Sequence, residues 1–363
     1  MNKQRVLAVD ILRGLTIIFM IIVNDPGSWS NVYQPLLHAE WNGLTPTDYI
    51  FPTFLFIMGT SIVLSLNKRA KNTEKLELVK KIFWRSFKIY AVGLFLWLWP
   101  EFNFERIRWV GVLPRIALVY FFVALFYVYT TKRTQFYVTT GLLSGYLFLM
   151  CFVPVPGIGF PDLSIPEKNW AHYIDNFLLP GVLWQKTWDP EGILSTFPAI
   201  ATGLLGVFAG YIITSKKELS EKLAELFVMA TILLILGDLT QYIFPLNKSL
   251  WSTSFTLMVG GISTLGLGFF IYICDVKKWG SYFRFAQEFG VNSIFSYVLA
   301  GMLTLIFYSS RLWGFKLSGL FMDIFTTLGM APKLTSLIYA ILYTTVIWVP
   351  VHYLFKKKIF IKL

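Results

Sequence analysis

Apolar runs long enough to cross a membrane recur along the whole chain. An α-helix rises about 1.5 Å per residue, so about 17–25 apolar residues span a hydrocarbon core of roughly 30 Å. Only 14% of the residues are charged, compared with about a quarter in soluble proteins. We predict an all-α, polytopic membrane helix bundle, with residues 1–363 forming a single transmembrane domain. The ten expected spans are 8–23, 49–66, 82–99, 112–129, 136–153, 193–214, 226–243, 252–274, 286–307 and 335–355.

The Lys and Arg residues outside these spans are unevenly distributed. If the N-terminus is cytoplasmic, 20 of them lie in cytoplasmic segments and 8 in outer segments. Cytoplasmic loops of membrane proteins carry an excess of Lys and Arg, so we predict that both termini are cytoplasmic. The net charge of +12 then reflects membrane topology, and no nucleic acid partner is expected. Residues 308–334 leave two alternatives open, an amphipathic surface helix or a further half-span.

The segment 38–59 places His38 in a short polar loop directly before a predicted span. Thr45-Pro46-Thr47-Asp48 is typical of a capping box, so Asp48 is expected to be at least partly structural. Pro52 is expected to kink the helix, and freed backbone groups are tolerated in membranes only where they are buried in protein or line a cavity. The pattern therefore predicts a cavity beside His38. A histidine there, with an unperturbed pKa of about 6.5, suits a general base or a nucleophile.

Ionisable residues inside spans are costly and therefore mark candidate functional sites. Arg13, Arg85 and Lys88 lie toward the predicted cytoplasmic side, where they could bind the phosphates of a cytoplasmic ligand. Two structural alternatives remain open for them. Arg85 and Lys88 could extend to the membrane surface, and Arg13 could pair with Asp10 one turn away.

A second polar group is expected at the outer side. Asn24 ends the first span there, and Arg115 and Asp238 lie toward the same ends of their spans. His172, in the outer segment 154–192, is the next histidine candidate after His38. Cys151 and Cys274 are expected at opposite membrane faces, which disfavours a disulfide.

Motifs for other reaction classes do not occur in the sequence. There is no G-x-S-x-G elbow, no H-E-x-x-H, no P-loop and no G-x-G-x-x-G pattern, and no metal site is expected. The glycines of 203–210 and 260–268 indicate close helix packing in place of nucleotide binding.

Seven segments carry a resemblance to a known family. They are VDILRG at 9–14, VNDPGSW at 23–29, HAEWNGLTPTDYIFPTFLFIMG at 38–59, GVLPRIALVY at 111–120, TFPAIATGLLGVFAG at 196–210, NKSLWSTSF at 247–255 and GVNSIFSYVLAG at 290–301. In this order they resemble the membrane domain of the heparan-α-glucosaminide N-acetyltransferase family, including its bacterial members, within the transmembrane acyltransferases.

The resemblance implies transmembrane acetyl transfer. Acetyl-CoA would be the cytoplasmic co-substrate, and the acceptor would be the amine of a glucosamine-type sugar on the outer side. His38 matches the family's active-site histidine, as base or acetyl carrier, and Asn24 matches its neighbouring asparagine. Asp48 is expected beside them, and Arg13, Arg85 and Lys88 are expected to hold the CoA phosphates. The expected acceptor-binding residues are Trp41, Asn42, Arg115, Asp238 and Lys248.

The loop between Asn24 and His38 is longer than in the family and differs from it, so the acceptor remains open. Two other functions are alternatives, a glycan O-acyltransferase and an amino-sugar permease. The expected location is a bacterial inner membrane, with the lipid bilayer as a partner. Small-residue helix faces and the resemblance are compatible with a homodimer.

Overall fold

The computed structural model describes residues 6–67 and 72–361, and its regular structure there is helical. Six of the basic residues counted as cytoplasmic lie outside the described residues, namely Lys3, Arg5, Lys68, Arg69, Lys71 and Lys362. The α-helices are α1 (Leu7–Asn24), α2 (Ile50–Leu66), α4 (Lys75–Leu98), α5 (Val112–Tyr129), α6 (Lys132–Phe152), α7 (Trp170–Leu178), α8 (Thr196–Ile213), α9 (Leu219–Thr240), α10 (Thr253–Ile271), α11 (Arg284–Val291), α12 (Ser293–Phe307), α13 (Leu317–Thr327) and α14 (Pro332–Lys356). Shorter helical segments are η1 (Gln34–Leu36), η2 (Pro46–Tyr49), η3 (Phe104–Arg106), η4 (Tyr272–Val276) and η5 (Gly280–Phe283).

Each predicted span coincides with a helix or a helix pair. Within the described residues, eight helices are long and apolar enough to cross a membrane. The pair Gly280–Val291 and Ser293–Phe307, bent by 72°, raises this number to nine if it forms one span. The predicted span 82–99 lies on α4, which carries Arg85 and Lys88 and is not among the nine. The protein is a polytopic membrane helix bundle.

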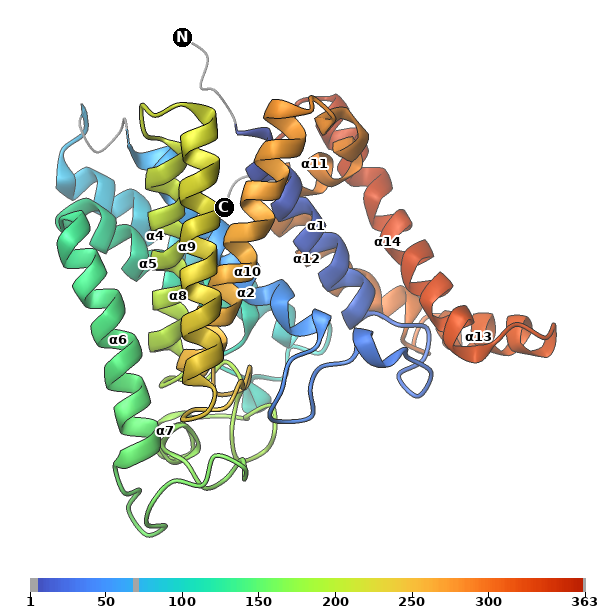
Figure 1. Ribbon diagram of the computed structural model, residues 1–363. Coiled ribbons are helices and arrows are strands. Elements are labelled where there is room, and N and C mark those ends of the chain that lie inside the picture. The colour runs from blue at the N-terminus through green and yellow to red at the C-terminus, as the bar shows by residue number, and fades with distance from the viewer. Residues whose placement is uncertain (1–5, 68–71, 362–363) are drawn as a thin grey trace.

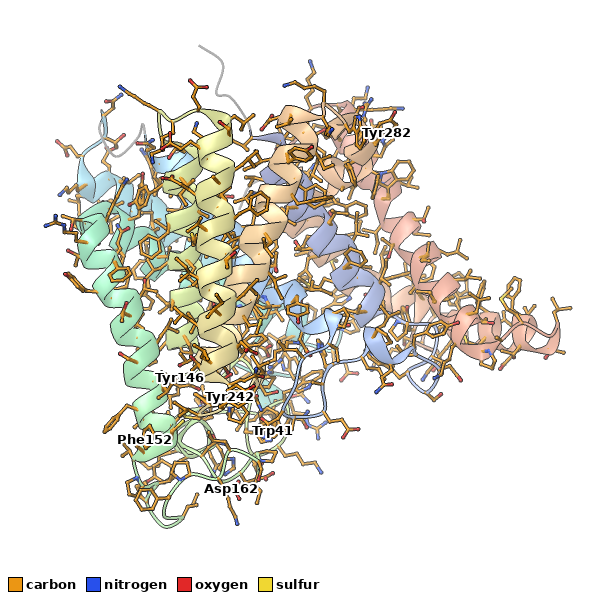
Figure 2. The ribbon with its side chains drawn as sticks, viewed as in Figure 1. Trp41, Tyr146, Phe152, Asp162, Tyr242 and Tyr282 are labelled. Carbon is orange, nitrogen blue, oxygen red and sulfur yellow. The ribbon has the colours of Figure 1, made fainter. Side chains whose placement is uncertain are left out.

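The two ends of the bundle differ in the length of their connections. α1 begins and α14 ends at the upper end in Figure 1, whereas the loops before α2, between α6 and α8, and between α9 and α10 gather at the lower end. Figure 2 places Trp41 and Asp162 at this lower end and Tyr282 at the upper end. We call the lower end the loop end. Segments far apart in sequence therefore meet there.

The segment 308–334 contains a short helix and no full span. α13 has 11 residues, or about 16 Å of rise, and the hydrocarbon core is roughly 30 Å thick. In Figure 1 it extends sideways from the loop end of α14. A further full span is therefore excluded, whereas a surface helix and a half-span are both compatible with the length of α13.

Small residues allow the central helices to pack closely. A Cβ added to Gly59 of α2 would lie 1.9 Å from the carbonyl oxygen of Gly203 on α8. A Cβ added to Gly290 of α11 would lie 1.8 Å from the carbonyl oxygen of Asp10 on α1. Backbones this close leave no room for a side chain, as expected for small-residue interfaces in membranes.

The entry to α2 confirms one local prediction and corrects another. The capping box is present: the Thr45 N–H donates to Asp48 Oδ2 at 3.0 Å, and the chain enters η2 at Pro46. The physical reason given for a kink at Pro52 does not hold. Pro52 lies in the first turn of α2, where a backbone N–H has no helical partner to lose, and residues 46–66 form one candidate span.

Candidate functional site

His38 is held by the carboxylate of Asp48. His38 Nδ1 lies 2.7 Å from Asp48 Oδ1, and the Asp48 side chain is 1% exposed while that of His38 is 47% exposed. The other carboxylate oxygen, Oδ2, accepts hydrogen bonds from the backbone N–H groups of Ala39 and Thr45. Asp48 is thus fixed by the capping box and fixes the ring in turn. We assign the Nδ1 proton to the Asp48 bond, which leaves the Nε2 lone pair available.

Lys248 brings a positive charge against the same ring. Its Nζ lies 3.0 Å from His38 Nδ1, 3.1 Å from Nε2 and 3.8 Å from Asp48 Oδ1. Burial lowers the pKa of the Lys248 ammonium, and the negative charge of Asp48 opposes that shift. The neighbouring Asn247 holds this segment in place, because its Nδ2 donates to Asn42 Oδ1 at 3.0 Å.

A cavity of about 980 Å³ adjoins this group, as predicted from the sequence. Its wall at the loop end includes His38, Asp48, Trp41 and Lys248. Its other wall consists of apolar and small residues of the membrane helices, from α1, α4, α5 and α12: Met20, Ile21, Leu96, Leu113, Ala300 and Gly301. The cavity therefore connects a polar site at the loop end with the interior of the bundle.

The end of α1 contributes two consecutive polar residues to the same cavity. Asn24 is the last residue of α1, and Asp25 is its C-cap. Asn24 is exposed, so its amide is accessible from the cavity that His38 lines. The predicted proximity of Asn24, His38 and Asp48 to one site is thus observed as a shared cavity.

Another part of the cavity wall contains a buried ion-pair network that the sequence prediction missed. Arg108 Nε donates to Asp189 Oδ2 at 2.7 Å, and Arg108 Nη2 donates to Glu191 Oε2 at 2.6 Å. The guanidinium also lies over the Trp97 and Trp184 rings, at 5.6 and 5.1 Å from their centroids. In the sequence, the high content of Trp and acidic residues in 154–192 indicated a polar, aromatic segment. It did not indicate which of these residues form ion pairs. Aromatic rings beside fixed polar groups suit a sugar ring.

The five predicted acceptor-binding residues have different positions. Trp41 and Lys248 line the cavity, whereas Asn42, Arg115 and Asp238 are not among the residues that line it. Arg115 is 1% exposed and donates to the Gly192 carbonyl at 3.0 Å and to Ser195 Oγ. Asp238 is exposed on α9, where Gln241 donates to its carboxylate at 2.5 Å. The structure thus places two of the five beside His38.

The basic residues predicted to hold CoA phosphates lie on the helices that wall the cavity. Arg13 on α1 donates to Ser61 Oγ at 2.5 Å and to the Gly290 carbonyl at 3.1 Å, and it pairs with Asp10 at 3.3 Å. On α4, Arg85 and Lys88 are exposed, and the Arg85 guanidinium lies over the Tyr120 ring. The alternative Asp10–Arg13 pair is therefore present.

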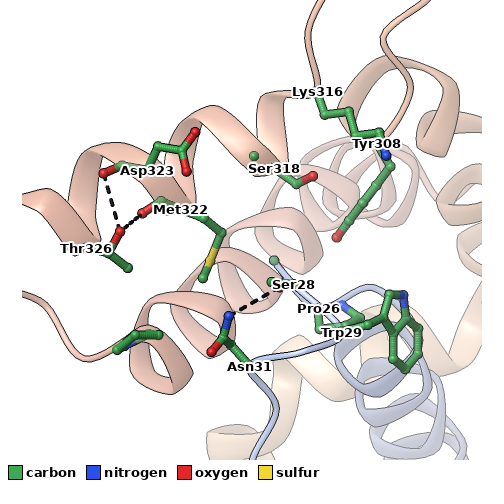
Figure 3. A pocket seen from close by; sticks show the side chains of 13 residues that line it. Pro26, Ser28, Trp29, Asn31, Tyr308, Lys316, Ser318, Met322, Asp323 and Thr326 are labelled. Carbon is green, nitrogen blue, oxygen red and sulfur yellow. Dashed lines mark hydrogen bonds between the residues drawn. The ribbon is translucent and has the colours of Figure 1, made fainter.

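A second pocket, of about 690 Å³, lies across the chain segment that follows α1 (Figure 3). We call residues 25–31 the α1 loop. Trp29 of this loop lines both pockets and is 62% exposed. Figure 3 shows Pro26, Ser28 and Asn31 of the loop facing Lys316 and the α13 residues Ser318, Met322, Asp323 and Thr326. The α1 loop thus separates the His38 cavity from a pocket against α13.

Comparisons with known proteins agree on the relationship of this chain to one family. The family model described as "Heparan-alpha-glucosaminide N-acetyltransferase, catalytic" matches residues 5–247. Over 353 residues, the chain is 30% identical to the heparan-alpha-glucosaminide N-acetyltransferase of Mus musculus, covering 82% of this chain and 53% of the mouse protein. The Homo sapiens protein of the same name is also 30% identical, with 81% and 52% covered. The chain spans about half the length of the curated relatives it matches.

Proposed function

Because the chain belongs to the heparan-α-glucosaminide N-acetyltransferase family, we propose that it is a transmembrane acetyltransferase. It moves the acetyl group of cytoplasmic acetyl-CoA to the amine of a glucosamine-type sugar on the other side of the membrane. The observation that carries this proposal is the Asp48–His38 pair, which lines the same cavity as Asn24.

His38 acts as the general base. The Asp48 bond to Nδ1 fixes the ring orientation and stabilises the imidazolium that forms when Nε2 takes a proton, as in Asp–His pairs of hydrolases. The acceptor ammonium releases one proton to water, and the free amine attacks the thioester carbon. The nitrogen then gives its second proton to Nε2 as the C–N bond forms. The C–S bond breaks, and the leaving thiolate takes that proton from the imidazolium.

Asn24 can supply a hydrogen-bond donor, and Lys248 a positive charge, where the thioester oxygen becomes negative. The Asn24 amide can donate to this oxygen, a contact worth about 10²–10³ in rate. The Lys248 ammonium already lies within 3.1 Å of both His38 ring nitrogens, so an oxyanion formed beside that ring is close to it. The Lys248 ammonium has to move away from His38 Nε2 before the amine approaches. An incoming acceptor can displace it.

The donor enters from the opposite end of the bundle. The apolar wall formed by α1, α4, α5 and α12 suits the pantetheine arm, and Arg13, Arg85 and Lys88 lie further along α1 and α4. From Arg13 to Asn24 is eleven residues, or about 16 Å of helix. These cations bind the CoA phosphates at the end of the bundle opposite the loop end, which we call the basic end.

The sidedness rests on the distribution of charge. With the loop end outside, cytoplasmic segments hold 20 basic residues and outer segments 8. We propose that the loop end faces away from the cytoplasm and that the membrane is a bacterial inner membrane.

The direct test is purified protein with acetyl-CoA, a panel of amino sugars and detection of free thiol. We expect thiol release that depends on the amino sugar, and an amide product that survives mild base. A base-labile product would instead indicate a glycan O-acyltransferase. Uptake of the sugar into vesicles without thiol release would indicate a permease and contradict the proposal.

A further inference from the structure

The cavity beside His38 carries an excess of acidic side chains. Seven charged residues line it, of which five are acidic and two are basic. Both basic residues already contact carboxylates, Arg108 those of Asp189 and Glu191, and Lys248 that of Asp48. The acidic residues are Asp25, Glu40, Asp48, Glu167 and Glu191. A cavity with this charge suits a cationic ligand more than an acidic sugar.

Asp25 differs from the other four carboxylates in its surroundings. Asp48 accepts from His38, Ala39 and Thr45, and Glu191 accepts from Arg108. Glu40 and Glu167 are exposed, so water solvates them.

By contrast, Asp25 is only partly exposed, and no hydrogen bond or ion pair from the part of the chain that the structure describes reaches its carboxylate. A partly buried carboxylate without a counter-ion is costly. Consistent with this, burial raises the pKa of Asp25 to about 7.

The backbone around Asp25 is fixed on both sides. The Asp25 N–H donates to the Ile21 carbonyl at 3.0 Å, and its own carbonyl accepts from the Tyr308 hydroxyl at 2.6 Å. The following residues of the α1 loop are attached to α14, where the Gly27 N–H donates to the Ser336 carbonyl and the Ser28 N–H to Ser336 Oγ. Asp25 is therefore held beside Asn24, while its carboxylate has no partner among residues 6–67 and 72–361.

We propose that Asp25 binds the protonated amine of the acceptor sugar and so selects amines over hydroxyls. This inference rests on the proposed function, because Asn24, the preceding residue, is placed at the thioester. An ammonium supplies the charge that the Asp25 carboxylate lacks, and a neutral hydroxyl does not. The same contact holds the amino group near the thioester carbon before it loses its proton. The α1 loop thereby becomes the segment that determines the acceptor.

The test is the Asp25→Asn variant, which keeps the side-chain shape and removes no hydrogen bond within the protein. A hydrogen bond to a charged group is worth about 1.5–3 kcal/mol, so KM for glucosamine should rise about 10- to 100-fold. The kcat and the KM for acetyl-CoA should stay within about twofold of wild type, a difference below about 0.5 kcal/mol. Asp323→Asn is the matched control, because Asp323 lies in the pocket on the other side of the α1 loop. An unchanged glucosamine KM in Asp25→Asn would overturn the inference.

Two further measurements separate folding and the proposed function from this inference. The Asp25 carboxylate has a raised pKa, so its ionisation destabilises the folded protein increasingly between the unfolded value of 3.8 and about 7. Asp25→Asn should therefore have a higher Tm than wild type, by more at pH 8 than at pH 5.

Equilibrium binding of glucosamine and of glucose, without acetyl-CoA, tests recognition even if no amide forms. We expect wild type to prefer glucosamine and Asp25→Asn to lose that preference. Equal binding of the two sugars by wild type would contradict the role of Asp25. Absence of amide product with intact glucosamine preference would contradict only the proposed acetyl transfer.

Discussion

The two ends of the bundle differ in how far their polar groups are fixed. At the loop end, His38 is 2.7 Å from Asp48 and 3.0 Å from Lys248, and Asp48 is anchored by two backbone N–H groups. At the other end of the bundle, Arg13 is held by Asp10, Ser61 and the Gly290 carbonyl, whereas Arg85 and Lys88 are exposed on α4. The difference fits a division of labour in which bond making needs fixed geometry, whereas phosphate binding also uses exposed cations.

Asp48→Asn should give the largest effect among substitutions around the fixed group. The amide can hold the wrong histidine tautomer, and the equivalent change in an Asp–His pair lowers kcat by about 10⁴. We expect kcat to fall by between about 10² and 10⁴ while acetyl-CoA still binds, measured by thiol release and by equilibrium binding. Glu167→Gln, at an exposed carboxylate of the same cavity, is the control. Activity near wild type in Asp48→Asn would show that catalysis by His38 does not depend on its hydrogen bond to the Asp48 carboxylate.

Asn24→Ala should lower kcat by about 10²–10³ if its amide stabilises the thioester oxyanion. The KM for acetyl-CoA should change little, because the contact forms only as the oxygen becomes negative. Asn31→Ala, in the pocket on the other side of the α1 loop, should retain activity. A rise in KM alone would assign Asn24 to substrate binding and not to transition-state stabilisation.

At the basic end, we predict a change in KM and not in kcat. Arg85→Gln should raise the KM for acetyl-CoA about tenfold, in line with a charge-assisted hydrogen bond of roughly 1.5 kcal/mol, and leave the acceptor KM unchanged. The acetyl thioester of dephospho-CoA, which has one phosphate fewer, provides the internal control. If Arg85 binds that phosphate, the KM values of the two donors should be closer to each other in the variant than in wild type. A fall in kcat with unchanged KM would mean that the two ends do not divide the work in this way.

Asp238→Asn should have the smallest effect. Its carboxylate is exposed on α9 and is not among the residues that line the cavity, so activity should stay within about twofold, or about 0.5 kcal/mol. Steady-state kinetics with glucosamine check this. A large loss of activity would restore Asp238 to the acceptor site that its sequence position suggested.

Sequence alone predicted the parts of this molecule that depend on local patterns. The apolar runs predicted the helices, and Thr45 and Asp48 predicted the capping box because a capping box is a contact between neighbours in sequence. The cavity beside His38 is observed, although Pro52, from which it was predicted, lies in the first turn of α2 and removes no helical hydrogen bond there. The prediction was therefore correct for a reason other than the one given.

The Arg108 ion-pair network could not be predicted because it joins residues that are distant in sequence. Arg108 meets Asp189 and Glu191 across more than 80 residues, and nothing local to Arg108 indicates those partners. Likewise, Arg115 and Asp238 were predicted at the same side of the membrane as His38, but neither lines its cavity, because position along a span does not fix which neighbour a helix faces.

The most direct measurement of the central claim compares His38→Ala with His172→Ala. His172 lies on α7 and is not among the residues that line the cavity, so it controls for removal of a histidine at the loop end. Both purified variants are given acetyl-CoA and glucosamine, and free thiol and N-acetylated product are quantified. The account predicts no product above background from His38→Ala, with acetyl-CoA binding and Tm retained, and near-normal turnover from His172→Ala. Sustained N-acetylation by folded His38→Ala protein would contradict it.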